Sequence, residues 1–109
     1  MNKEISTDIF SREVIDNPGL SIVRFYKSWN GACQIIAPIF DELSVSYKGQ
    51  ASFYSVDVEA NKDLATGYGI MDVPTILFFR MGMMIDHSTG LTPKNILIHK
   101  IEKALSTLN

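Results

Sequence analysis

The residue with the clearest potential for chemistry is Cys33, the only cysteine among 109 residues. A thiolate can attack a disulfide, but release of the resulting mixed disulfide needs a second thiol. One cysteine therefore permits at most a mixed disulfide that an outside thiol must resolve. A lone cysteine on the core side of a helix is also commonly a small hydrophobic residue, so a purely structural role for Cys33 stays open.

Other kinds of site are not indicated. His87 and His99 show no ligand spacing relative to Cys33, so we expect no metal site. No glycine-rich phosphate loop occurs, so we expect no cofactor. The net charge is −2 without a basic run, which argues against nucleic acid and against an anionic membrane surface as partners.

The composition is that of an ordinary globular domain. Apolar residues make up 46% of the chain, and the length predicts one domain, residues 1–109. No window reaches the roughly 18 apolar residues of a membrane span. The first residues, MNKEISTDIF, have no signal-like apolar region, so we expect a cytoplasmic location.

The elements that must position Cys33 follow from the apolar periodicity. Leu20–Tyr26 is a mostly apolar run rich in strand formers and predicts a buried strand. Apolar residues then recur at helical spacing over Ala32–Tyr47, which predicts a helix with a kink at Pro38. Cys33 would therefore lie in the first turn of that helix.

The remaining segments extend the same alternation. We expect an edge strand at Lys3–Ile5, a helix that stops at Asn17-Pro18-Gly19, a strand at Ser52–Val58, a helix at Asn61–Tyr68, a strand at Thr75–Phe79 paired in a hairpin with Met83–Asp86, and a last helix begun by Thr92-Pro93. This order predicts an α/β fold with a central mixed β-sheet, helices on both faces, a terminal β-hairpin and a C-terminal helix. Strand alternation puts Met83 and Met84 on opposite faces, so we expect one of them in the core.

Two motifs resemble active-site stretches of the thioredoxin family. Residues 23–34 read V-R-F-Y-K-S-W-N-G-A-C-Q and are followed by Ala37-Pro38, against a family pattern of roughly V-D-F-W-A-x-W-C-G-P-C-K. Residues 68–75 read Y-G-I-M-D-V-P-T and are similar to the family's Y-G-I-x-x-[IV]-P-T. The resemblance covers essentially the whole chain and implies a thioredoxin fold.

The chain departs from the family pattern at the residues that carry the chemistry. The resemblance places Asn30 at the nucleophilic cysteine, Ala32 at the proline between the cysteines and Arg24 at a buried aspartate, while Cys33 matches the second cysteine. A lysine often found near that aspartate aligns with Phe53. Because an amide cannot replace the nucleophile, we do not expect an active protein-disulfide oxidoreductase. Asparagine is a favoured N-cap, so Asn30 is expected to cap the helix instead.

Arg24 allows two interpretations. The resemblance places its side chain beneath the first helical turn, where a cation and the helix N-terminus would favour a thiolate–guanidinium pair with Cys33. Alternatively, only the stem of Arg24 is buried and the charged end extends to water.

The resemblance also implies a peptide-binding surface that needs no thiol. Pro74 matches the family's cis-proline, and the backbone of Val73 would pair with an extended segment of a partner. The residues expected to form this surface are Trp29, Asn30, Gly31, Ala32, Ile70, Val73, Pro74 and Gly90. Simple packing is the alternative role for Trp29 and Pro74.

We therefore predict a thioredoxin-like protein that lacks the two-cysteine redox centre and binds a protein or peptide at the Trp29/Pro74 face without disulfide reductase turnover. The alternative is a residual single-thiol role in cell redox homeostasis, through a mixed disulfide at Cys33. A third candidate, a single-thiol peroxidase, needs an exposed thiol with supporting donors, and the sequence carries no signature for it.

Overall fold

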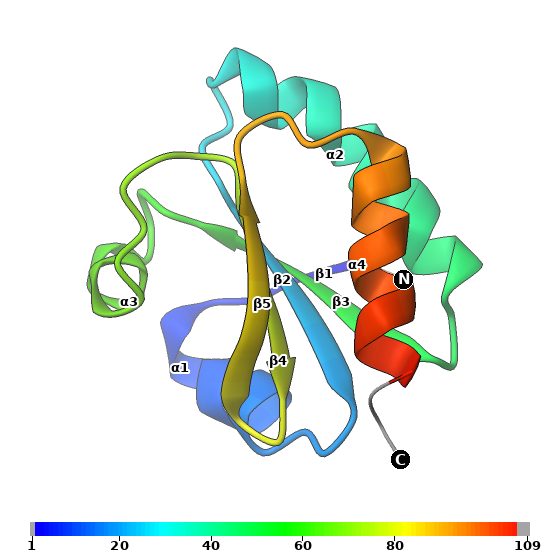
Figure 1. Ribbon diagram of the computed structural model, residues 1–109. Coiled ribbons are helices and arrows are strands. Elements are labelled where there is room, and N and C mark those ends of the chain that lie inside the picture. The colour runs from blue at the N-terminus through cyan, green and yellow to red at the C-terminus, as the bar shows by residue number, and fades with distance from the viewer. Residues whose placement is uncertain (1, 107–109) are drawn as a thin grey trace.

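A five-stranded mixed sheet with helices against both faces forms the computed structural model, which describes residues 2–106 (Figure 1). The strand order is β1-β3-β2-β4-β5, in which β1, β3 and β2 are parallel and the last two strands are antiparallel. The strands are β1 (Asn2–Glu4), β2 (Leu20–Tyr26), β3 (Ala51–Asp57), β4 (Thr75–Arg80) and β5 (Met83–Thr89). The helices are α1 (Thr7–Phe10), the π-helical η1 (Ser11–Ile15), α2 (Gly31–Ser46), α3 (Lys62–Gly67) and α4 (Lys94–Ser106). The predicted α/β fold, with its terminal hairpin and C-terminal helix, is confirmed.

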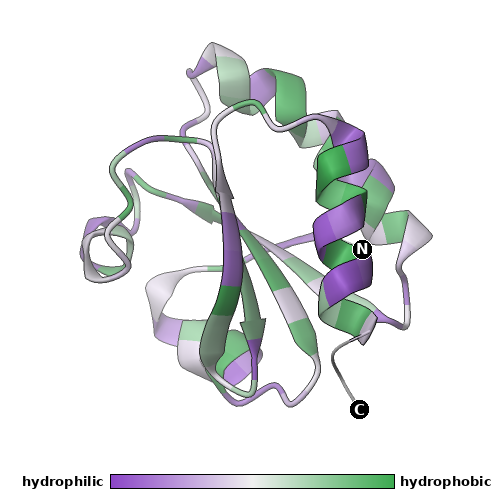
Figure 2. Ribbon diagram, in the orientation of Figure 1, coloured by the Kyte–Doolittle hydropathy of each residue, from purple (hydrophilic) through white to green (hydrophobic). Residues whose placement is uncertain are grey.

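The sheet separates two hydrophobic cores, because successive side chains of a strand point to opposite faces. One core joins the sheet to α2 and α4, and the other joins it to α1, η1 and α3. Figure 2 shows the corresponding pattern on α4, where hydrophobic and hydrophilic bands alternate along the helix. Fully buried members of the first core include Ile22, Phe40, Phe53, Phe78 and Ile101, and members of the second include Val14, Val23, Phe25, Val56 and Phe79.

The hairpin departs from the expected pattern. Met83 and Met84 are 71% and 50% exposed, so the expectation that one of them lies in the core is wrong. β5 is an edge strand whose first three residues are exposed on both faces. A register shift also interrupts the simple alternation, because Phe79 pairs with Met84 whereas Phe78 pairs with Asp86, and Ile85 is left as the extra residue.

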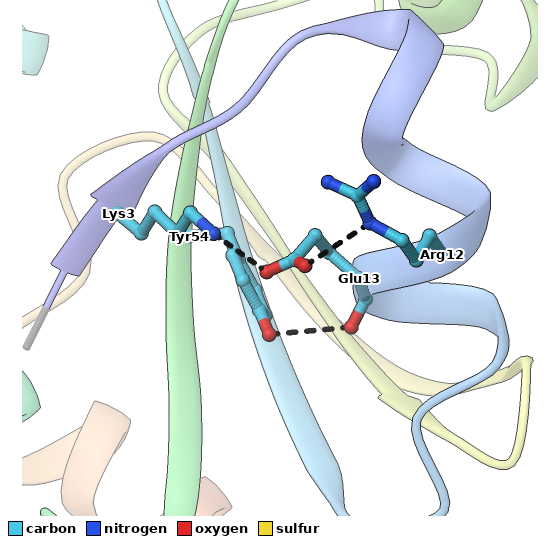
Figure 3. A network of polar contacts seen from close by, with 4 residues as sticks. All are labelled: Lys3, Arg12, Glu13 and Tyr54. Carbon is cyan, nitrogen blue, oxygen red and sulfur yellow. Dashed lines mark hydrogen bonds and ion pairs between the residues drawn. The ribbon is translucent and has the colours of Figure 1, made fainter.

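A polar network holds β1 against η1 (Figure 3). Lys3 Nζ lies 3.0 Å from Glu13 Oε1, and Arg12 Nε lies 3.6 Å from Glu13 Oε2. The Tyr54 hydroxyl donates a 3.2 Å hydrogen bond to the backbone oxygen of Glu13. The hydrogen bond from Lys3 lowers the pKa of Glu13. Since exposed ion pairs add little to stability, the main effect of the network is to orient η1 against β1 and β3.

Candidate functional site

The strand register brings three loops to one end of the sheet. Phe25 near the end of β2 pairs with Thr75 at the start of β4, and Thr75 also pairs with Thr89 at the end of β5. The segments that follow β2, precede β4 and follow β5 therefore leave the sheet at the same end, where α2 begins (Figure 1). These segments carry the predicted residues at positions 29–33, 73–74 and 90. These residues, together with Ile70, are called the candidate site below.

Asn30 is the N-cap of α2, as the sequence predicts. Its backbone is extended (φ −83°, ψ 128°), and its side-chain oxygen accepts a 2.9 Å hydrogen bond from the backbone N–H of Cys33. This bond satisfies one of the backbone donors that a helix leaves unpaired at its start. The position that holds the nucleophile in the resembled family is thus occupied by a structural group.

Replacing Asn30 with alanine is expected to lower the free energy of unfolding by about 1 kcal/mol, because the Cys33 N–H loses its capping acceptor. Asn30→Ser retains a capping oxygen and should stay close to the unchanged protein. Urea denaturation followed by circular dichroism measures both variants. Equal losses for the serine and alanine variants would show that the cap does not stabilise α2.

Cys33 is a free cysteine that is 2% exposed on the core side of the first turn of α2. It borders a pocket of about 160 Å³, whose other lining residues include Arg24, Lys27 and Ser28. The thiol thus faces a small opening in the surface but presents almost no area to solvent. Of the two roles left open by the sequence, this burial favours the structural one.

Arg24 lies inside the protein, 8% exposed. Its Nε and Nη2 donate hydrogen bonds of 3.2 and 3.0 Å to the Ser55 hydroxyl, rather than to Cys33. The guanidinium carbon lies 4.5 Å from the ring centroid of Tyr26 and 5.5 Å from that of Phe40, so two aromatic rings contact the cation. The charged end therefore borders the interior instead of extending to water. Burial lowers the pKa of Arg24.

The residue beside Arg24 on the neighbouring strand is Ser55, not Phe53. The register of β2 with β3 pairs Arg24 with Ser55 and pairs Ile22 with Phe53. The residue bonded to Arg24 thus lies two positions beyond Phe53 on β3.

A hydrogen-bonded chain leads from the buried cation to a carboxylate on α2. The Ser55 hydroxyl donates to Asn2 Oδ1 at 2.9 Å, and the Asn2 amide donates to Asp41 Oδ1 at 3.0 Å. This chain polarises each bond toward Asp41 and helps to offset the cost of burying Arg24. Sequence reasoning missed Asn2, Ser55 and Asp41, because only the pairing of β1 with β3 and the packing of α2 against β1 bring them together.

A second carboxylate, that of Glu4, also acts on the charge of Arg24. The Tyr26 hydroxyl donates a 2.9 Å hydrogen bond to Glu4 Oε1. Burial and this hydrogen bond raise the pKa of Tyr26 to about 12. Burial also raises the pKa of Glu4, while the hydrogen bond from Tyr26 and the charge of Arg24 act in the opposite direction. The family's buried carboxylate is thus replaced by a buried cation with carboxylates around it.

Trp29 is 63% exposed but is held in place. Its indole N–H donates a 2.9 Å hydrogen bond to Glu59 Oε1, and Lys27 Nζ lies 5.3 Å from the ring centroid. The ring therefore presents apolar surface to solvent from a fixed orientation.

The loop before β4 packs against the loop after β5. The Val73–Pro74 peptide bond is cis, and the backbone N–H of Gly90 donates a 2.8 Å hydrogen bond to the Pro74 carbonyl. Gly90 has φ +82°, a conformation that favours glycine. Pro74 is buried, so it supports the surface from below instead of forming its rim. Of the other predicted surface residues Gly31 is exposed, and Asn30, Ala32, Ile70, Val73 and Gly90 are partly buried.

Neither a metal site of the usual kind nor a membrane helix occurs among residues 2–106. No group of three or more His, Cys, Asp or Glu side chains in that range could hold a metal ion. No helix there is long and apolar enough to cross a membrane.

Comparison with known proteins identifies the family. The family model described as Thioredoxin matches residues 2–103. The chain is 32% identical to thioredoxin 1 of Nostoc sp., over 94% of this chain and 95% of that protein, and 36% identical to a thioredoxin of Staphylococcus aureus, over 80% and 84%. The crystal structure of Malassezia sympodialis thioredoxin (Mala s 13) aligns with a TM-score of 0.88 at 30% identity, covering 96% of this chain and 91% of that one. The chain belongs to the thioredoxin family.

Proposed function

We propose that this thioredoxin-family chain binds a protein or an extended peptide at the candidate site and does not turn over disulfides. One observation carries the proposal: Asn30, at the family's nucleophile position, caps α2 while the remaining thiol, Cys33, is 2% exposed. A buried lone thiol without a resolving partner cannot complete a cycle of disulfide exchange. A cytoplasmic location is part of the same proposal.

The exposed ring of Trp29 supports the binding part of the proposal. Tryptophan is enriched among the residues that dominate binding energy at protein interfaces. The contacts of the ring with Glu59 and Lys27 restrict its motion before a partner arrives, so less side-chain entropy is lost on binding. Val73, in the loop at the same end of the sheet, is proposed to pair through its backbone with an extended segment of the partner.

A second candidate function is a single-thiol role in cell redox homeostasis. One observation favours it: Cys33 borders a surface pocket that Arg24 and Lys27 also line, and this pocket gives a partner's sulfur a route to the thiol. The thiolate would attack one sulfur of a partner disulfide, form a mixed disulfide and release the other sulfur as a thiolate. An outside thiol would then be needed to free Cys33.

Capture of partners on the immobilised protein from a native extract of the source cells distinguishes the two functions. We expect Trp29→Ala to weaken the free energy of partner binding by roughly 2 kcal/mol or more, since it removes the exposed apolar ring, and retention should fall accordingly. Cys33→Ser should retain the same partners. Val45→Ala is the matched control, because Val45 is 60% exposed on α2 but lies several turns beyond the candidate site.

Retention that survives Trp29→Ala would contradict the binding surface proposed here. Partners that Cys33→Ser fails to retain, and that dithiothreitol releases from the unchanged protein, would instead support the single-thiol role. As the only tryptophan, Trp29 also reports directly on occupancy, since its fluorescence emission should shift when a partner covers the ring.

A further inference from the structure

A surface pocket of about 340 Å³ lies between β5 and the loop that follows α3. The loop contributes Met71 and Asp72 to its wall, β4 contributes Leu77, and β5 contributes Met84 and His87. Neither Trp29 nor Cys33 belongs to the lining, so the pocket is separate from the proposed thiol chemistry.

The β-bulge at Ile85 brings Met84 and His87 to the same face of β5. In a regular strand, residues three apart point to opposite faces. Here Met84 pairs with Phe79 and His87 pairs with Leu77, and these two β4 residues are two apart on one face. The extra residue therefore makes Met84 and His87 neighbours on that face. β-bulges change the direction of side chains in this way.

The contacts of Asp86 agree with this assignment of faces. Its carboxylate lies 3.1 Å from Lys100 Nζ on α4, which packs on the opposite side of the sheet from α3. Asp86 is thus turned away from the pocket and paired with a lysine.

Two thioethers and an imidazole therefore line one small pocket. Met71 is 90% exposed and Met84 is 50% exposed, so both sulfurs lie within reach of a solute. Methionine has three rotatable bonds, which allow the two side chains to close around a ligand. Soft thioether sulfur selects soft metal ions such as Cu(I), and imidazole also suits copper. Asp72 also lines the pocket, but a single carboxylate does not make the oxygen-rich ligand set that hard divalent ions prefer.

We propose that Met71, Met84 and His87 form a surface site for Cu(I). The ion keeps its oxidation state on binding, and His87 contributes a neutral ring nitrogen. The site includes neither Cys33 nor Trp29, and its pocket shares only Ile70 with the candidate site.

Anaerobic titration of the protein with Cu(I) against a chromophoric Cu(I) chelator tests the site. We expect one equivalent to bind, with shifts in the NMR signals of the Met71 and Met84 methyl groups and of the His87 ring. Met84→Leu and His87→Phe should each raise the Kd by roughly tenfold or more, since even outer-shell changes at metal sites cost that much. Met83→Leu is the matched control, because it makes the same chemical change on the opposite face of β5.

Cys33→Ser should bind Cu(I) as the unchanged protein does. Loss of binding in Cys33→Ser would place the ion on the thiol and overturn the proposal. Absence of binding, or equal affinities for Met84→Leu and Met83→Leu, would overturn it as well. Methyl shifts that arise from a captured peptide but not from Cu(I) would show that the pocket holds a partner side chain instead of a metal. Circular dichroism spectra of all variants confirm that any loss is not due to unfolding.

Discussion

Restoring an acidic residue at position 24, in the variant Arg24→Asp, is expected to lower the free energy of unfolding by roughly 3–5 kcal/mol. The new carboxylate would be buried in the network that now surrounds a cation, with Glu4 and Asp41 as like-charged neighbours. The substitution would also remove the two hydrogen bonds that the guanidinium donates to the Ser55 hydroxyl. A buried charge without a partner is among the costliest changes in a protein core. Urea denaturation at neutral pH measures the loss.

Arg24→Met is the matched control for this variant. It removes the charge but keeps an unbranched stem beside Tyr26 and Phe40. The Ser55 hydroxyl would lose the hydrogen bonds that it accepts from Arg24 but would keep the one that it donates to Asn2. We expect a change of about 1 kcal/mol or less. If aspartate is tolerated as well as methionine, the surrounding carboxylates do not exclude a negative charge at position 24.

Phe40→Ala is expected to destabilise the protein by roughly 3–5 kcal/mol, through lost burial and the cavity that remains. Phe40 is 1% exposed, and its ring lies 5.3 Å from that of Phe53 in an edge-on arrangement. The substitution also removes one of the two rings that contact Arg24. Its effect should therefore reach the first turn of α2, where Cys33 and the candidate site lie.

Val45→Ala on the same helix separates core packing from a general effect on α2. Val45 is 60% exposed, and its truncation should change the free energy of unfolding by about 0.5 kcal/mol or less. Chemical denaturation gives both values. Similar losses for the two variants would mean that α2 is not anchored through Phe40.

Local patterns in the sequence predicted the fold well. The strand predicted at Leu20–Tyr26 has those bounds in the structure, and the helix predicted at Ala32–Tyr47 spans Gly31–Ser46. Apolar runs and helical spacing determine such elements from neighbouring residues alone. The N-cap role of Asn30 was predictable for the same reason, because a cap depends on a few adjacent residues.

What sequence reasoning missed depends on pairing between distant segments. Arg24 contacts residues of β2, β3 and α2, and only the strand register brings Ser55 beside it. The exposure of an edge strand likewise cannot be read from alternation, so the expectation that Met83 or Met84 lies in the core was wrong. The burial of Pro74 matches the packing role that the sequence left open for it, and it follows from the way two loops pack together.

The rate of insulin-disulfide reduction tests most directly the claim that this thioredoxin-family chain does not turn over disulfides. The assay compares the unchanged protein with Cys33→Ser, in the presence of dithiothreitol and with a dithiol thioredoxin as the positive control. We predict that the two proteins give the same rate, because a buried single thiol cannot complete the exchange cycle. A rate for the unchanged protein that clearly exceeds that of Cys33→Ser would contradict the claim and would make Cys33 a working thiol.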